Sequence, residues 1–468
     1  MQFNSLPFLL FFPIVCCAVW AIRNLRARNS FLLVASYFFY MSWEPRFGLL
    51  LLFCSVTAYF GGIALGRRKR GLTLAFAIGT LLANLFFFKY LGFASSVVVS
   101  LFDALGIRFT IPLPQILLPV GISFYTFQAI GYLVDVYNRK VAPEKNFIDF
   151  TLFVSFFPQL VAGPIERAGN LIHQIKVLHK FDYSQASIGA RQMLWGYFLK
   201  LVVADRLALY SDPIFRMSEA HNGSSLLLAT FFFSIQIYCD FAGYSLIAIG
   251  CSKMMGFNLM KNFDCPYFSC SVTEFWRRWH ISLSKWLKDY VYIPLGGNRC
   301  GRVRHKLNIL LTFLISGIWH GANWTFLIWG LLHGVFQVFE KITGLDKPSS
   351  RLFFRILQRL CTFSLVTFAW IFFRSKNLEG ALDIVKKILY SITHGFAMPA
   401  AFELSTMAFA FMAIAALFCK DLLDTFLPRQ KAWLMGKAPV RYCICLVICL
   451  WILTAGVFDN GQFIYFQF

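Results

Sequence analysis

Three histidines in one region of the chain are the side chains best suited to chemistry, because imidazole exchanges protons near neutral pH. His280 lies within the string FWRRWHISLSKWL, His320 within WHG and His333 within LHG, and all three are surrounded by apolar residues. A single histidine in an apolar segment is more often a hydrogen-bonded structural group than a catalyst. Inside a membrane, however, ionisable side chains are costly and tend to mark function. Residue chemistry alone therefore ranks His320 first as a proton acceptor, His280 second and His333 last, and favours structural roles for His280 and His333.

The segment that carries His280 predicts an amphipathic helix, because its apolar residues recur every three or four positions. These residues are Trp276, Trp279, Leu283, Leu287 and Val291, and the basic residues mainly on the other side are Arg277, Arg278, Lys285 and Lys288. His280 is expected on the buried face. A basic helix with tryptophan on its apolar face is typical of a membrane interface.

A basic segment separates this helix from the apolar run that ends at His320. Pro294 and the glycine pair 296–297 end the helix, and the basic residues that follow are Arg299, Arg302, Arg304 and Lys306. The simplest interpretation of 299–306 is a solvated cytoplasmic loop. Attraction of an anionic substrate by this loop, together with Arg277 and Arg278, is the alternative.

The composition predicts that these segments are held in a membrane. Of the 468 residues, 58% are hydrophobic and 14% are charged, whereas soluble domains carry roughly 25% charged residues. Repeated apolar runs predict an all-α polytopic protein of roughly eleven transmembrane helices. Interfacial and re-entrant helices and a central cavity complete the predicted single domain, residues 1–468. The net charge of +22 fits basic cytoplasmic loops and anionic lipids rather than nucleic acid.

Some apolar segments depart from an ordinary span. The run Leu6–Ile22 has no basic residue before it and several after it, so we expect a retained first span with its N-terminus outside. Lys89 interrupts the long run Leu72–Phe102 and predicts a broken span. The run 147–163 contains Pro158 and is followed by a second proline. It is either a re-entrant segment that lines a cavity or an ordinary short span.

Buried charges and the absence of common cofactor motifs limit the remaining possibilities. Lys200 and Asp205 lie in the predicted span 188–209, and Asp240 lies in the span 225–250. We expect Asp240 to pair with a basic residue of the bundle rather than to act in catalysis. The thirteen cysteines include no Cys-x-x-Cys motif, and no phosphate-binding loop, dinucleotide fingerprint, nucleophile elbow or paired-histidine metal motif is found. No metal site and no bound cofactor are therefore predicted.

The central strings resemble the membrane-bound O-acyltransferase family. FWRRWHISLSKWLKDYVYIPLGGNR, followed by SGIWHGANWTFLIWGLLHG, carries the resemblance, and within the family the pattern is most similar to bacterial alginate O-acetyltransferase membrane subunits. PVGISFYTFQAIGYLVDVY at 119–137, FFPQLVAGPIER at 156–167 and GQFIYFQF at 461–468 fit the same branch. The resemblance covers nearly the whole chain in order.

The resemblance implies acyl transfer from a thioester to a hydroxyl group. It implies that His320 is the catalytic base or acyl relay and that His280 is the second motif histidine. Trp276, Arg278, Trp319 and Asn323 are the substrate-binding candidates. The implied protein lies in the bacterial inner membrane as a multi-pass enzyme. It would take acetyl groups from cytoplasmic acetyl-CoA and serve O-acetylation of an exopolysaccharide, alginate-like, through a periplasmic acyltransferase partner.

Two alternatives stay open at this point. The same fold could transfer D-alanyl or acetyl groups to teichoic acid or peptidoglycan. A protein of another class, a non-enzymatic export scaffold, would need neither motif histidine. The identity of the polysaccharide, of the modified hydroxyl group and of the partner, and the oligomeric state, are also open.

Overall fold

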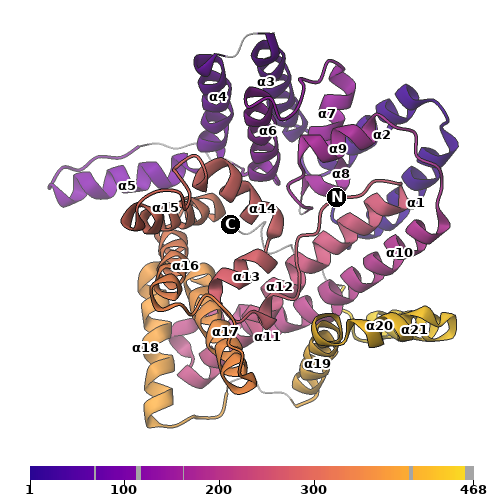
Figure 1. The fold of residues 1–468 in the computed structure, drawn as a ribbon. Helices are drawn as coiled ribbons and strands as arrows, with labels where there is room; N and C mark the ends of the chain where they lie inside the picture. Colours follow the sequence, from indigo (N-terminus) through magenta and orange to yellow (C-terminus); the bar gives the residue numbers. More distant parts are fainter. Residues whose placement is uncertain (68–69, 112–116, 162, 400–403, 459–468) are drawn as a thin grey trace. The chain divides into compact units, whose positions relative to one another are not determined.

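The computed structural model describes residues 1–67, 70–111, 117–161, 163–399 and 404–458. Within these ranges every regular element is helical, mostly α-helix with short 3-10 and π-helical turns (Figure 1). The predicted all-α class is confirmed. The string at 461–468 lies outside the described residues. Contacts divide the chain into two compact units, Met1–Gly189 with Cys251–Met260 and Ala190–Gly250 with Lys261–Phe468.

Several helices have the length and apolar character of membrane spans. Among the described residues six qualify, which are α3 (Phe47–Arg67), α4 (Gly71–Lys89), α12 (Gly223–Met254), α17 (Leu352–Arg374), α19 (Leu404–Phe426) and α21 (Ala438–Ala455). Helices α1 (Leu6–Ala21) and α5 (Leu91–Ala104) are apolar but shorter. The other segments predicted as spans also form helices, which are shorter or more polar. The polytopic character predicted from the sequence is confirmed.

The first unit is held together by buried polar contacts as well as apolar packing. Its other helices are α2 (Leu25–Met41), α6 (Ile122–Tyr137), α7 (Phe147–Ser155), α8 (Phe157–Leu160) and α9 (Ala168–Ile175). The guanidinium group of Arg28 donates to the carbonyl oxygens of Ile175 at 2.7 Å and Val177 at 2.8 Å. The side chain of Asn29 donates to Asp149 at 2.8 Å. These bonds fasten α2 to α7 and to the end of α9, because buried donors and acceptors are stable only when paired.

Both interrupted segments predicted in this unit are interrupted in the structure. Helix α4 ends at Lys89 and α5 begins at Leu91, which confirms the broken span. The segment 147–163 forms the 9-residue α7 and the 4-residue α8, separated at Phe156. Helix α7 is about 14 Å long and is too short to cross a hydrocarbon core of about 30 Å. A single continuous helix over 147–160 is therefore excluded, and both alternatives for this segment, re-entry into the membrane and an ordinary short span, stay predictions.

The second unit contains the three histidines and an extensive apolar core. Its other helices are α10 (Tyr183–Tyr197, which begins in the first unit), the π-helix Phe198–Ala204, α11 (Asp205–Arg216), α13 (Val272–Arg278), α14 (Ile281–Leu287), the π-helix Lys288–Tyr292, α15 (Arg302–His320), α16 (Trp324–Thr343), α18 (Leu378–His394) and α20 (Pro428–Gly436). Helices α15 and α16 lie side by side (Figure 1).

A buried ion pair inside this core confirms the expectation for Asp240. The Nζ atom of Lys200 lies 2.7 Å from Oδ1 of Asp240 and 2.7 Å from Oδ1 of Asp205. Lys200 lies in the π-helix, and its side chain is 1% exposed. An isolated charge in such a core would be costly, and the pairing removes most of that cost. Asp240 therefore has a structural partner, as predicted.

Candidate functional site

The continuous helix predicted across His280 is wrong, because the chain breaks at that residue. Helix α13 ends at Arg278, Trp279 is extended, and His280 has the left-handed angles φ 43° and ψ 53° before α14 begins. Such angles strain a non-glycine residue and persist only where the surroundings impose them. The loop before α13 imposes them here: the N–H of Asp264 donates to the carbonyl of Arg278 at 2.9 Å, and the N–H of Ile281 donates to the carbonyl of Asn262 at 2.8 Å.

The predicted burial of this segment is confirmed despite the break. Trp276, Trp279, Leu283 and Leu287 are buried, and His280 is 0% exposed. Val291 is half-buried, whereas Arg277, Lys285 and Lys288 are exposed and Arg278 is half-buried. The break therefore changes the direction of the chain without changing which side chains enter the core.

The side chain of Asn262 fixes the protonation of His280. Its Oδ1 accepts from the backbone N–H of Ser282 at 3.3 Å and from the Ser282 hydroxyl at 2.9 Å, and its Nδ2 donates to Ser245 at 3.1 Å. These partners set the orientation of the amide. The same Oδ1 lies 3.2 Å from Nδ1 of His280, so Nδ1 carries the proton and Nε2 carries the lone pair. Burial lowers the pKa of His280 and keeps the imidazole neutral.

His320 is the last residue of α15 and is enclosed by aromatic rings. It is 3% exposed. Its ring centroid lies 4.9 Å from Trp319, 4.8 Å from Trp329 and 5.5 Å from Phe373, in edge-to-face arrangements. Such an enclosure excludes bulk water, which strengthens every electrostatic interaction made inside it.

Glycines allow the backbone to form this enclosure. The residue after His320 must be small, because a Cβ on Gly321 would lie 2.1 Å from the ring of Phe326. Helices α15 and α16 cross at Gly317 and Gly330, and a Cβ on Gly330 would lie 2.4 Å from the carbonyl oxygen of Phe313. The glycine of the WHG string and this close crossing therefore bring Trp329 of α16 against His320.

Trp319 brings the two predicted catalytic histidines into one cluster. Its ring centroid lies 6.0 Å from His280 and 4.9 Å from His320. His280 also contacts Phe241 of α12 edge-on, at a centroid distance of 4.6 Å. The two histidines and Trp319, predicted separately from three motif positions, are therefore neighbours in the structure.

His333 belongs to the same cluster, although residue chemistry ranked it last of the three histidines. It is 0% exposed, and its Nδ1 accepts a hydrogen bond from Nε1 of Trp276 at 3.2 Å. The Trp329 ring contacts both His320 and His333, with its centroid 4.8 Å from His320 and 5.0 Å from His333. The spacing of four residues between Trp329 and His333 is the one signal that could have indicated this contact, because such residues share a helix face.

A carboxylate joins the helices that carry this cluster. Glu340 of α16 accepts from the backbone N–H groups of Val272 and Thr273, the latter at 2.9 Å, and from the Thr273 hydroxyl at 2.9 Å. These are unpaired donors of the first turn of α13, where the helix dipole also favours a negative charge. Sequence reasoning missed Glu340, Asn262 and Phe373, because none of them lies near a motif histidine in the chain.

The remaining predicted binding residues have structural partners. Arg278 pairs with Glu274 at 2.7 Å and donates to the carbonyl of Asp264 at 3.4 Å. Asn323 is the N-cap of α16: its side chain accepts from the N–H of Thr325 at 3.2 Å and donates to the carbonyl of Lys376 at 2.7 Å. Trp276 and Trp319 lie inside the histidine cluster, whereas the contacts of Arg278 and Asn323 hold helix ends and loops.

The basic segment at 299–306 is only partly a loop. Helix α15 begins at Arg302, so the last five residues of the predicted loop are helical. The helix extends into the basic segment because a first turn that faces solvent needs no apolar residue. Arg302 and Arg304 are exposed, which agrees with the predicted solvation.

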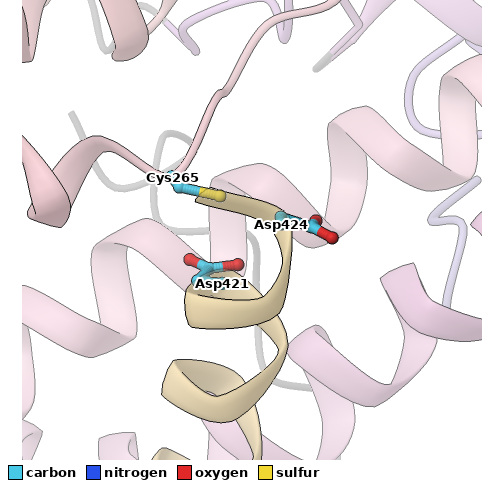
Figure 2. A group of neighbouring side chains, drawn as sticks. All are labelled: Cys265, Asp421 and Asp424. Atoms are coloured by element: carbon cyan, nitrogen blue, oxygen red, sulfur yellow. The ribbon is translucent and has the colours of Figure 1, made fainter. Parts of the chain in front are cut away.

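One group of side chains in this unit has the composition of a metal site. Ligand atoms of Cys265, Asp421 and Asp424 lie within 4.8 Å of one another (Figure 2). Two lysines already neutralise the carboxylates: Lys420 lies 3.3 Å from Asp421 and 2.9 Å from Asp424, and Lys431 also pairs with Asp424. The Tyr238 hydroxyl donates to Asp421 at 2.9 Å. We therefore interpret the group as an ion-pair network that fastens α19 to α20 and α12.

The histidine cluster can accept and donate protons in a dry environment. His280 presents a lone pair at Nε2, and His320 lies among aromatic rings that exclude bulk water. A neutral buried imidazole is well suited to general-base catalysis on a hydroxyl group. The arrangement therefore fits a group transfer that must avoid hydrolysis.

Comparisons with known proteins agree with this chemistry. The sequence model of the family described as MBOAT, membrane-bound O-acyltransferase family, matches residues 142–379. A protein of Pseudomonas putida described as a probable alginate O-acetylase is 37% identical over 100% of both chains. The peptidoglycan O-acetyltransferase of Helicobacter pylori is 34% identical over 82% of this chain and 79% of its own. The teichoic acid D-alanyltransferase of Bacillus subtilis is 28% identical over 55% of this chain and 69% of its own.

Proposed function

Because this chain belongs to the membrane-bound O-acyltransferase family and is a multi-pass membrane acyltransferase, we propose that it serves the O-acetylation of an exported polysaccharide, alginate-like. The donor is acetyl-CoA on the cytoplasmic side, and the protein lies in a bacterial inner membrane. The acetyl group reaches the polymer through a periplasmic acyltransferase partner. Similarity over the full length of the Pseudomonas putida protein supports this acceptor over a cell-wall polymer.

The proposed reaction moves one acetyl group and one proton. The acceptor oxygen attacks the thioester carbonyl carbon, a C–O bond forms and the C–S bond breaks. His320 takes the hydroxyl proton and returns it to the CoA sulfur, so that the enzyme ends each cycle unchanged. His280 accepts a hydrogen bond at Nε2 and orients the donor or the intermediate. The observation that carries this proposal is the shared contact of both histidines with Trp319, at centroid distances of 6.0 and 4.9 Å.

The test is ester analysis of the exported polymer. Cells that lack the chain are complemented with wild type, His320→Ala or His394→Ala at equal membrane abundance. His394 is the matched control, because it is an exposed histidine at the end of α18. We expect His394→Ala to restore acetyl esters fully and His320→Ala to lower their rate of formation by about 10²–10⁴-fold, the usual contribution of a general base.

Each other outcome has a distinct meaning. Full complementation by His320→Ala would refute the role of that residue. If wild type changes D-alanine esters or cell-wall acetate and leaves the exported polymer unaltered, the polysaccharide acceptor is wrong and the acyl transfer stands. If a variant with both His280 and His320 replaced by alanine acetylates the polymer normally, the chain acts as an export scaffold and the proposed mechanism is refuted.

A further inference from the structure

A tryptophan determines the protonation of His333. An indole N–H is a donor and cannot accept, so the 3.2 Å bond from Nε1 of Trp276 to Nδ1 of His333 requires a lone pair on Nδ1. A neutral imidazole carries one proton, which must then lie on Nε2. His333 is therefore a donor at Nε2, which is the opposite tautomer from His280.

This donor has no acceptor among the residues that the structure describes. Nε2 of His333 is buried and makes no hydrogen bond among the described residues. A buried polar group without a partner destabilises the folded state, and most buried polar groups in proteins are paired. A ligand that supplies an acceptor at this position would pair the donor.

The donor is held rigidly, and one tryptophan contacts both it and the proposed catalytic base. The Glu340 bonds to Val272 and Thr273 fix α16 against α13, and the Trp276 bond fixes the imidazole within α16. Trp329 contacts His333 at 5.0 Å and His320 at 4.8 Å between ring centroids. A donor with these restraints needs no reorganisation when charge develops next to it, which is the property that stabilises an oxyanion.

We infer that Nε2 of His333 donates a hydrogen bond to the carbonyl oxygen of the acyl group during transfer. This inference rests on the proposed function and assigns an additional catalytic residue to it. When the acceptor oxygen attacks the carbonyl carbon, the π electrons move to the carbonyl oxygen, and His333 binds the resulting oxyanion. The electrons return as the C–S bond breaks, and His333 keeps its proton throughout, while His320 carries the transferred proton.

Kinetics separate this role from a packing role. His333→Phe keeps an aromatic ring and removes the donor, and His333→Gln keeps an amide that can accept from Trp276 and donate to the substrate. We expect His333→Phe to lower kcat by about 10²–10³-fold, the effect of removing one oxyanion donor, with little change in the KM for acetyl-CoA. His333→Gln should retain clearly more activity than His333→Phe. If both variants match wild type, the inference is wrong.

Vibrational spectroscopy tests the bond directly. Acetyl-CoA labelled with ¹³C at the carbonyl is bound to the purified full chain carrying His320→Ala, which prevents turnover. A hydrogen bond to the carbonyl lowers its stretching frequency. We expect a lowered frequency in His320→Ala and a return to the free value when His333→Phe is added. Equal carbonyl frequencies in the two proteins would refute the role of His333 and leave the proposed function intact, because acetyl-CoA would still bind. If none of the proteins, including wild type, binds the labelled acetyl-CoA, both this inference and the proposed use of acetyl-CoA are refuted.

Discussion

A methyl group added at Gly330 is expected to displace Trp329 from His320 without touching either side chain. A Cβ at position 330 would lie 2.4 Å from the carbonyl oxygen of Phe313, whereas ordinary contacts begin at 3.4 Å. The Cα of Gly317, 3.1 Å away, closes the other side. Both obstacles are backbone atoms, so no side-chain rotation relieves the overlap. Helices α15 and α16 must separate by about 1 Å at this point.

The expected cost of Gly330→Ala is larger for activity than for stability. Overpacking of this kind costs about 1–3 kcal/mol, which a folded membrane domain can tolerate. A displacement of about 1 Å in the geometry of a site can reduce the rate about 10²-fold. We therefore expect a folded protein with acyl transfer lowered about 10²-fold, measured as acetyl transfer per unit of membrane protein, with thermal unfolding followed in parallel.

Gly334 provides the matched control on the same helix. A Cβ there would lie 3.1 Å from the Leu310 side chain and 3.3 Å from its Cα, so a shift of a few tenths of an ångström suffices. Gly334→Ala should keep activity within a few-fold of wild type. If Gly330→Ala is folded and as active as Gly334→Ala, the close crossing does not set the geometry of the site, and the reasoning is refuted.

Two further substitutions test the contacts that hold the site and the core. Asn262→Leu removes the acceptor of His280 Nδ1 and of the Ser282 N–H. We expect acyl transfer to fall at least 10-fold and the melting temperature to drop, because each buried donor left unpaired costs about 1–3 kcal/mol; unchanged transfer at normal abundance would contradict the orienting role. Lys200→Met leaves Asp205 and Asp240 without their ammonium group and should destabilise the protein by about 3–5 kcal/mol. Thermal unfolding measures this loss, and adding Asp205→Asn and Asp240→Asn should recover most of it; failure of the triple variant to recover would show that packing, not charge, explains the loss.

Sequence patterns predicted the features that depend on residues close together in the chain. The three-to-four-residue spacing of apolar side chains identified the buried face around His280, which is 0% exposed. The cost of charge in an apolar run predicted the break at Lys89 and the pairing of Asp240 with a basic residue of the bundle, which the structure identifies as Lys200. The resemblance to acyltransferases rested on the strings around His280 and His320, and the structure brings these two residues together through Trp319.

Contacts between distant residues explain what the sequence did not predict. The helix break at His280 depends on Asn262, which is 18 residues away in the chain, and helix periodicity carries no information about such a partner. His333 ranked lowest because its bond comes from Trp276, 57 residues away. Asn323 was predicted to bind substrate, but its position before an apolar run equally suits an N-cap, and the structure gives it that contact.

The two partner side chains give His280 and His333 complementary roles. A carbonyl oxygen, that of Asn262, faces Nδ1 of His280 and leaves a lone pair at Nε2. An indole N–H, that of Trp276, faces Nδ1 of His333 and leaves a proton at Nε2. Acyl transfer to a hydroxyl group needs both an acceptor for a proton or hydrogen bond and a donor for the developing oxyanion. Histidine supplies both roles because the hydrogen-bond partner of Nδ1 differs between the two residues. Exchanging these partners, rather than the histidines, should therefore disable the site while leaving all three imidazoles in place.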